Sequence, residues 1–100
     1  EAAWLLLLGD AAKDIIAGGW RDFNIDELIQ KANNLHVAEL LLGGARDPRM
    51  AFGQRVARWK GRLLTDSKGR LFEFGTRKAN VGSLYRVRVF TDKEKLDLAS

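Results

Sequence analysis

Carboxylates and arginines are the side chains in this sequence whose types and spacing could carry chemistry. The chain has no cysteine and one histidine, His36. Disulfides, thiolate catalysis and cysteine zinc sites are therefore excluded, and so is a metal site built from several histidines. We expect no metal and no other cofactor. His36 itself is expected to be a partly buried surface residue rather than a ligand.

Five carboxylates lie in the first third of the sequence: Asp10, Asp14, Asp22, Asp26 and Glu27. In an enzyme they would serve as general acids or bases. They fall on the faces and caps of predicted helices, where the sequence offers no basic or metal partner to tune their pKa. A carboxylate enzyme is thus the weakest of the functions considered, and we expect this chain to be no enzyme.

Basic side chains are concentrated in the second half of the chain. The 17 lysines and arginines and the 13 acidic residues give a net charge of only +4. Residues 1–45, however, hold three basic and seven acidic side chains, whereas residues 46–88 hold twelve basic ones, nine of them arginine, and three acidic ones. Such a block is typical of polyanion binding, with a merely solvated surface as the alternative. Arginine suits phosphate oxygens and guanine edges.

Residues 1–45 predict a helical scaffold that would support this basic block. Residues 2–8 are the most apolar run, far shorter than the ~18 residues of a membrane span, so we expect no membrane partner. Apolar residues at helical spacing between positions 3 and 15 predict a first helix, ended by the glycine pair at 18–19. Residues 20–23 predict a short edge strand.

Two further helices are predicted before the basic block begins. Asn24 and Glu27 have the spacing of a capping box, and the helix that they start is expected to end near residues 33–34. Residues 36–42 predict another short helix, closed by the glycine pair at 43–44.

The basic block opens with a predicted helix over about residues 48–60. Asp47 and Pro48 give a strong start signal, an N-cap followed by proline at the first helical position. A narrow apolar stripe follows at helical spacing: Phe52, Val56, Trp59 and Leu63. If this stripe packs against the scaffold, the opposite face of the helix is basic and exposed.

The remainder of the block predicts a β-hairpin over about residues 62–90. Strands are expected at 62–65 and 70–74, joined by a turn. Residues 85–89 alternate between apolar and arginine side chains, which predicts a strand with one apolar and one basic face. Residues 75–83 are polar and flanked by glycine, and we expect them to form a basic loop.

This order of elements resembles that of winged helix-turn-helix domains. The resemblance implies an α+β fold in which three or four helices pack on a small antiparallel β-hairpin wing. The domain would span residues 1–100 and would be part of a longer protein. In that family the helix before the hairpin enters the major groove of DNA, while the wing touches the backbone or the minor groove.

A closer resemblance covers Arg46 to Val89, which reads RDPRMAFGQRVARWKGRLL, then the hairpin, then SLYRVRV. This stretch is similar to the carboxy-terminal winged-helix modules of primase or helicase-type replication proteins of phages and mobile elements. It implies a role in DNA replication, in the cytoplasm or nucleoid of a bacterial or phage-infected cell. An ATPase or primase activity would lie outside these residues, which contain no GxxxxGK[ST] pattern.

We therefore predict a DNA-binding module whose partner is double-stranded DNA. The predicted helix over 48–60 would read the major groove and the predicted loop would hold the backbone. The candidate DNA-binding residues are Arg46, Arg49, Gln54, Arg55, Arg58, Lys60, Arg62, Arg77, Lys78, Asn80 and Arg86.

Protein docking without nucleic-acid contact is the alternative function, because winged helices also serve as docking domains. Leu5, Leu6 and Met50 lie off the predicted core stripes and would contribute to such a surface. The partner would be another domain of the same protein or a second copy of the chain. RNA binding is a third alternative. The scarcity of aromatic residues in the basic block argues against single-strand binding by stacking.

Overall fold

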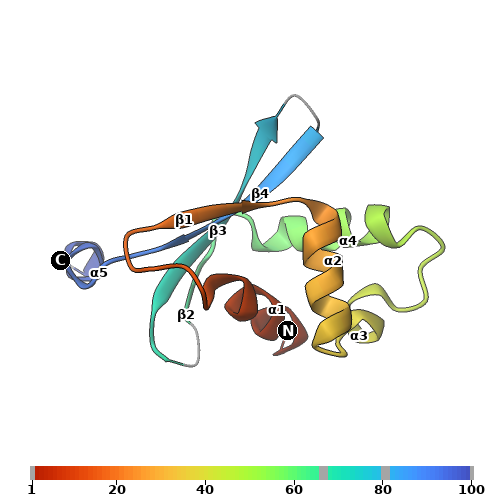
Figure 1. Cartoon of the computed structure of the whole chain (residues 1–100), viewed down its shortest axis with the longest axis horizontal. Helices are drawn as coiled ribbons and strands as arrows, with labels where there is room; N and C mark the ends of the chain where they lie inside the picture. The colour runs from red at the N-terminus through yellow and green to blue at the C-terminus, as the bar shows by residue number, and fades with distance from the viewer. Residues whose placement is uncertain (1, 66–67, 80–81, 100) are drawn as a thin grey trace.

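The computed structural model describes residues 2–65, 68–79 and 82–99, and over these residues helices pack on one face of a four-stranded antiparallel sheet (Figure 1). The elements in chain order are α1 (Ala2–Ala12), β1 (Trp20–Phe23), α2 (Ile25–Asn34), α3 (Ala38–Leu42), α4 (Pro48–Val56), the 3-10 turn η1 (Ala57–Trp59), β2 (Leu63–Thr65), β3 (Leu71–Ala79), β4 (Gly82–Val89) and α5 (Asp92–Ala99). The expected α+β class is confirmed.

The sheet pairs a strand from the first quarter of the chain, β1, with one from its last quarter, β4. Its strand order is β1-β4-β3-β2. β3 and β4 form a long hairpin, paired from residues 72–79 to residues 82–89, and β2 adds to the outer side of β3. The expected edge strand at 20–23 is confirmed, and it pairs with β4 so that Trp20 lies opposite Arg88.

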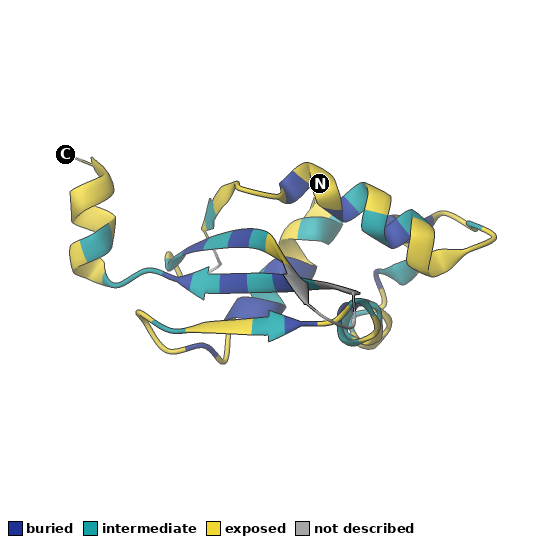
Figure 2. Cartoon of the chain, turned by 90° about the horizontal axis from the view of Figure 1, so that it is seen from above, coloured by how far each residue is buried: buried dark blue, intermediate teal, exposed yellow. Residues whose placement is uncertain are grey.

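The two faces of the sheet have different side chains because successive residues of a strand point to opposite sides. One face is buried against the helices and carries Phe23, Phe72, Phe74, Tyr85, Val87 and Val89. Tyr85 stacks on Phe74 with ring centroids 5.8 Å apart, and burial raises the pKa of Tyr85. The other face, which Figure 2 views, carries Arg77, Arg86 and Arg88. The predicted apolar and basic faces of residues 85–89 are therefore confirmed.

The β3–β4 hairpin is longer than the sequence predicts. Residues 75–83 were expected to form a loop, but β3 runs to Ala79 and β4 begins at Gly82. The strand pairing continues because its hydrogen bonds join backbone groups and do not depend on side-chain type. This end of the hairpin projects beyond the helices, where no core requires apolar residues (Figure 1).

α1 ends earlier than predicted, at Ala12 rather than at the glycine pair 18–19. Its last carbonyls need partners because the final turn of a helix leaves them without intrahelical donors. The Ala12 carbonyl accepts from the Ile15 N–H at 3.1 Å and from Arg70 Nη2 at 2.9 Å, and Arg70 Nη1 donates to the Ile15 carbonyl just beyond the helix at 2.8 Å. Ile15 is nevertheless buried, as its place in the predicted stripe requires.

The predicted limits of α2 and α3 are confirmed within two residues. The Asn24 side chain accepts from the Glu27 backbone N–H at 2.8 Å, and the Glu27 carboxylate accepts from the Asn24 N–H at 3.2 Å, which completes the capping box. α3 ends at Gly43 in the left-handed conformation, with φ of 54°. His36, expected to be partly buried, is exposed because it lies in the turn between these helices.

α5 was not predicted, and it extends away from the body of the protein (Figure 2). Thr91 and Glu94 cap its start, each accepting a hydrogen bond from the backbone N–H of the other. These bonds from Thr91, together with the Arg88 guanidinium, hold the pKa of Glu94 below its usual value. No helix in the described part of the chain is long and apolar enough to cross a membrane.

Candidate nucleic-acid interface

The stretch from Arg46 to Arg62, which contains α4 and η1 and is called here the α4–η1 segment, carries seven of the eleven predicted DNA-binding residues. Asp47 caps α4 by accepting from the Met50 N–H at 3.2 Å. The predicted helix over 48–60 is realised as α4 followed by one 3-10 turn. Its predicted stripe is buried at Phe52, Val56 and Trp59, but Leu63 is 47% exposed. The reason is that the chain turns at Gly61, in the left-handed region, and enters β2 before the stripe can continue.

Burial of this stripe leaves basic side chains of the segment in solvent. Gln54, Arg58, Lys60 and Arg62 are exposed, and so is Arg46 before the helix. Among the residues that the structure describes, none of the four cations in this set lies within 4.0 Å of a carboxylate. Arg49 differs, because its guanidinium forms an exposed ion pair with Asp26 at 3.5 Å.

Three predicted site residues line one groove. Arg55, Arg58 and Arg62 surround a space of about 600 Å³ between α1, α3 and the α4–η1 segment. Trp4, Leu40, Leu41, Gly43 and Trp59 complete the lining, and no described carboxylate belongs to it. Arg55 is only half-exposed and donates from Nη1 to the Leu41 carbonyl near the end of α3. We call this the α1–α4 groove.

The predicted site residues on the hairpin have a different environment. Arg86 lies 3.2 Å and Arg77 3.7 Å from the Asp22 carboxylate, and Arg86 also stacks on the exposed Trp20 at 4.0 Å from its ring centroid. The guanidinium of Arg88 pairs with Glu94. Each of these arginines therefore has an acidic partner, in contrast to Arg46, Arg58, Lys60 and Arg62, although Arg77 and Arg86 share the single carboxylate of Asp22. Lys78 lies in β3, and Asn80 lies outside the described residues.

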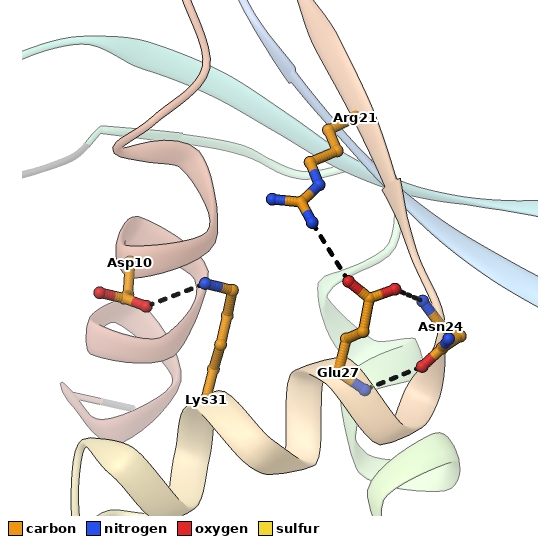
Figure 3. A network of polar contacts seen from close by, with 5 residues as sticks. All are labelled: Asp10, Arg21, Asn24, Glu27 and Lys31. Carbon is orange, nitrogen blue, oxygen red and sulfur yellow. Dashed lines mark hydrogen bonds and ion pairs between the residues drawn. The ribbon is translucent and has the colours of Figure 1, made fainter.

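The five carboxylates in the first third of the sequence were expected to have no basic partner. This expectation is wrong for four of them, because each lies within 4.0 Å of a lysine or arginine: Asp10, Asp22, Asp26 and Glu27. The Asp10 carboxylate lies 2.9 Å from Lys13 Nζ. Figure 3 shows that it also lies beside Lys31, at 3.4 Å, and that the Glu27 carboxylate lies 3.3 Å from the Arg21 guanidinium. Burial raises the pKa of Asp10, but the hydrogen bond from Lys13 and the charge of Lys31 outweigh it, and the net pKa is lowered. These pairs join α1, β1 and α2, which indicates a structural role.

The sequence analysis did not predict that Trp4 and Trp59 line the α1–α4 groove. Trp4 was assigned to the stripe of α1, yet it also lines the α1–α4 groove, and its ring centroid lies 6.5 Å from that of Trp59. No local pattern could have joined Trp4 to Arg58, because they meet only through tertiary packing. The described residues contain no cluster of His, Asp and Glu that could hold a metal ion.

Comparisons of the chain with protein-family models, with curated proteins and with solved structures found no match.

Proposed function

We propose that this chain is a DNA-binding module that contacts the DNA phosphate backbone mainly through the α4–η1 segment. The observation that carries the proposal is the set of four cations without an acidic neighbour among the described residues: Arg46, Arg58, Lys60 and Arg62. Cations that are not already paired release condensed counterions when they meet phosphates, which is the main source of affinity for DNA.

We further propose that the fold is a winged helix with additions. β1 joins the last strand of the long hairpin, and α2 runs steeply across α4 (Figure 1). α4 would then be the recognition helix, with Gln54 and Arg58 facing DNA, and the end of the β3–β4 hairpin would be the wing. β2, α3 and α5 would be additions to the simplest arrangement. The resemblance of Arg46–Val89 to modules of phage and mobile-element replication proteins supports a role in DNA replication.

Charge reversal at one exposed cation tests the proposal. Arg58→Glu and a control, Lys93→Glu on the exposed surface of α5, each change the net charge by two units. We expect Arg58→Glu to weaken binding to a fluorescent DNA duplex about tenfold or more, since hydrogen bonds to charged groups contribute about 1.5–3 kcal/mol. Lys93→Glu should bind like the wild type.

Salt dependence provides the second readout. Four phosphate contacts give a slope of log K against log salt concentration of roughly −4. An affinity for duplex DNA that hardly changes with salt would contradict the proposal. So would equal weakening by the two substitutions, because binding would then depend on net charge rather than on the α4–η1 segment.

Protein docking remains a second candidate, favoured by exposed apolar residues of α1. Leu5 is 42% and Leu6 58% exposed, and both line a largely apolar groove of about 520 Å³ beside Leu35. Met50 is also exposed. Charge reversal separates the candidates: a folded Arg58→Glu and Lys78→Glu double variant that keeps its DNA affinity would favour docking.

A further inference from the structure

We propose that the α1–α4 groove holds one unpaired nucleotide of a DNA strand, with its phosphate among Arg55, Arg58 and Arg62 and its base beside Trp4. The inference rests on the proposed function for the class of partner, and it adds a preference for DNA with unpaired nucleotides over continuous duplex.

The first argument is charge. The groove is lined by three guanidinium groups and by no described carboxylate. A second hollow, of about 330 Å³ on the open face of the sheet, is also lined by three arginines, but Glu73 belongs to its lining and Asp22 and Glu94 pair with its arginines. Of these two hollows, the α1–α4 groove is therefore the one better suited to the negatively charged phosphate of a DNA strand.

The second argument is preorganisation. The Arg55 guanidinium is already held by the Leu41 carbonyl, and the Arg62 guanidinium lies 5.1 Å from the ring centroid of Trp59. Side chains that are fixed before binding lose less conformational entropy when a ligand arrives. Each guanidinium has five N–H donors, so Arg55 retains donors for a phosphate while it holds α3.

The third argument is the aromatic wall. Trp4 is half-buried and belongs to the lining of the groove, whereas Trp59 is 6% exposed and lies beneath the Arg62 guanidinium. Leu40, 75% exposed, stands at the rim. A flat apolar wall next to cations suits a base attached to a phosphate, because bases stack on aromatic side chains irrespective of their identity. The volume of about 600 Å³ falls within the range of roughly 300–1,000 Å³ that holds small ligands.

The shape of the site selects among DNA structures. A continuous duplex presents a convex surface whose bases are paired and stacked, so no base can enter a groove between helices. An unpaired nucleotide enters without the cost of about a few kcal/mol for unstacking and unpairing. We therefore expect forked DNA to bind more tightly than a blunt duplex of the same sequence.

Indole N–H signals in an NMR titration test the site directly, because Trp20 lies on the open face of the sheet and serves as an internal reference. The probe is thymidine 5′-monophosphate, compared with thymidine and with inorganic phosphate. We expect the nucleotide to shift the signals of Trp4 and Trp59 saturably and to leave Trp20 unchanged.

A matched pair of variants tests the groove in DNA binding. Leu40→Glu adds a carboxylate at the rim, and Leu98→Glu adds one at an exposed site on α5. We expect Leu40→Glu to weaken nucleotide binding about tenfold or more, since it places like charge against phosphate. It should also abolish the preference for forked over blunt DNA, whereas Leu98→Glu should retain both.

The possible results distinguish failure of the groove proposal from failure of the proposed function. Absence of shifts at Trp4 and Trp59 at millimolar nucleotide, equal shifts with inorganic phosphate alone, or equal losses in the two variants would each overturn the groove proposal. Salt-dependent duplex binding without nucleotide binding would overturn it while leaving the proposed function standing. Nucleotide binding without DNA binding would show a site for free mononucleotides, and it would overturn both the proposed function and the assignment of the groove to a DNA strand.

Discussion

His36 has a left-handed backbone conformation, with φ of 59°, which is uncommon for residues other than glycine. It follows α2, where the His36 N–H donates to the Asn33 carbonyl and the Val37 N–H donates to the Ala32 carbonyl. This pair of bonds is a Schellman motif, and Val37 and Ala32 are both buried beside it. The imidazole is exposed, so the position serves to end a helix.

Glycine at this position should stabilise the protein. We expect His36→Gly to raise the free energy of unfolding by roughly 0.5–1 kcal/mol, because it removes the steric cost of a Cβ in the left-handed region and this gain exceeds the added entropy of the unfolded chain. Urea unfolding measures the change. His36→Ala keeps the Cβ and is the control, and a glycine variant no more stable than the alanine variant would refute the interpretation.

Arginine residues of this chain have two separate roles. Arg55 and Arg70 donate to backbone carbonyls near the ends of α3 and α1, and so they hold helices in place. Arg58 has no described partner and is available to an anion. Because residue type is the same in both roles, the role of each arginine follows only from its neighbours in the folded chain.

At the scale of elements, α5 is attached to the domain by few contacts. None of its residues is buried, and its polar links include the Arg88–Glu94 pair, the Thr91–Glu94 cap and a hydrogen bond from Lys95 to the Gly69 carbonyl. Partly exposed ion pairs of this kind contribute little to stability. The core of the domain therefore does not depend on α5.

Removal of residues 92–100 should leave the fold intact. We expect the free energy of unfolding to fall by less than about 1 kcal/mol, since the truncation exposes no core residue and removes an exposed pair. Circular dichroism and urea unfolding of the chain ending at residue 91 would check this. Loss of cooperative unfolding in the truncated chain would show that α5 packs on the core.

The helical elements were predictable wherever a capping pattern coincided with apolar periodicity. Asn24 and Glu27 marked the start of α2 for this reason. Thr91 and Glu94 have the same spacing, but no buried stripe follows them, so the signal of α5 was overlooked. The length of the β3–β4 hairpin was not predictable, because a polar strand that projects from the body has no apolar alternation.

The candidate interface was predictable in composition but not in detail. The density of arginine identified the basic block, and the apolar stripe of α4 identified which face is buried. Which arginines have an acidic neighbour depends on residues that are distant in sequence. Asp22, for example, lies beside Arg86 because β1 pairs with β4. The α1–α4 groove likewise requires Trp4 to meet the α4–η1 segment across the core.

At the scale of the whole molecule, the acidic first half and the basic second half partly neutralise each other. Asp22 pairs with Arg77 and Arg86, and Asp26 pairs with Arg49. Among the described residues, the α4–η1 segment therefore groups four cations that have no acidic neighbour. An approaching polyanion is consequently attracted to one part of the surface rather than to the entire second half of the chain.

Arg70 connects the two halves of the chain by hydrogen bonds. It lies between β2 and β3, and it donates to the carbonyl of Ala12, at the end of α1, and to that of Ile15, just after it. We expect Arg70→Met to lower the free energy of unfolding by about 1–3 kcal/mol, because the Ile15 carbonyl loses its described donor and the Ala12 carbonyl keeps only the Ile15 N–H. Arg46→Met, at an exposed site, should change it by less than about 0.5 kcal/mol. Thermal unfolding compares the two, and equal melting temperatures would disprove the link.

The pairing of β1 with β4 also determines when the chain can fold during synthesis. Residues 20–23 meet their partners at 85–88, and the helices α2, α3 and α4 lie in the loop between them. Non-local pairing of this kind closes slowly, since the entropy of the loop must be lost first. Until the ribosome has released β4, Phe23 and the part of α1 that packs on β4 stay uncovered, although α1 can already pack on α2, α3 and α4.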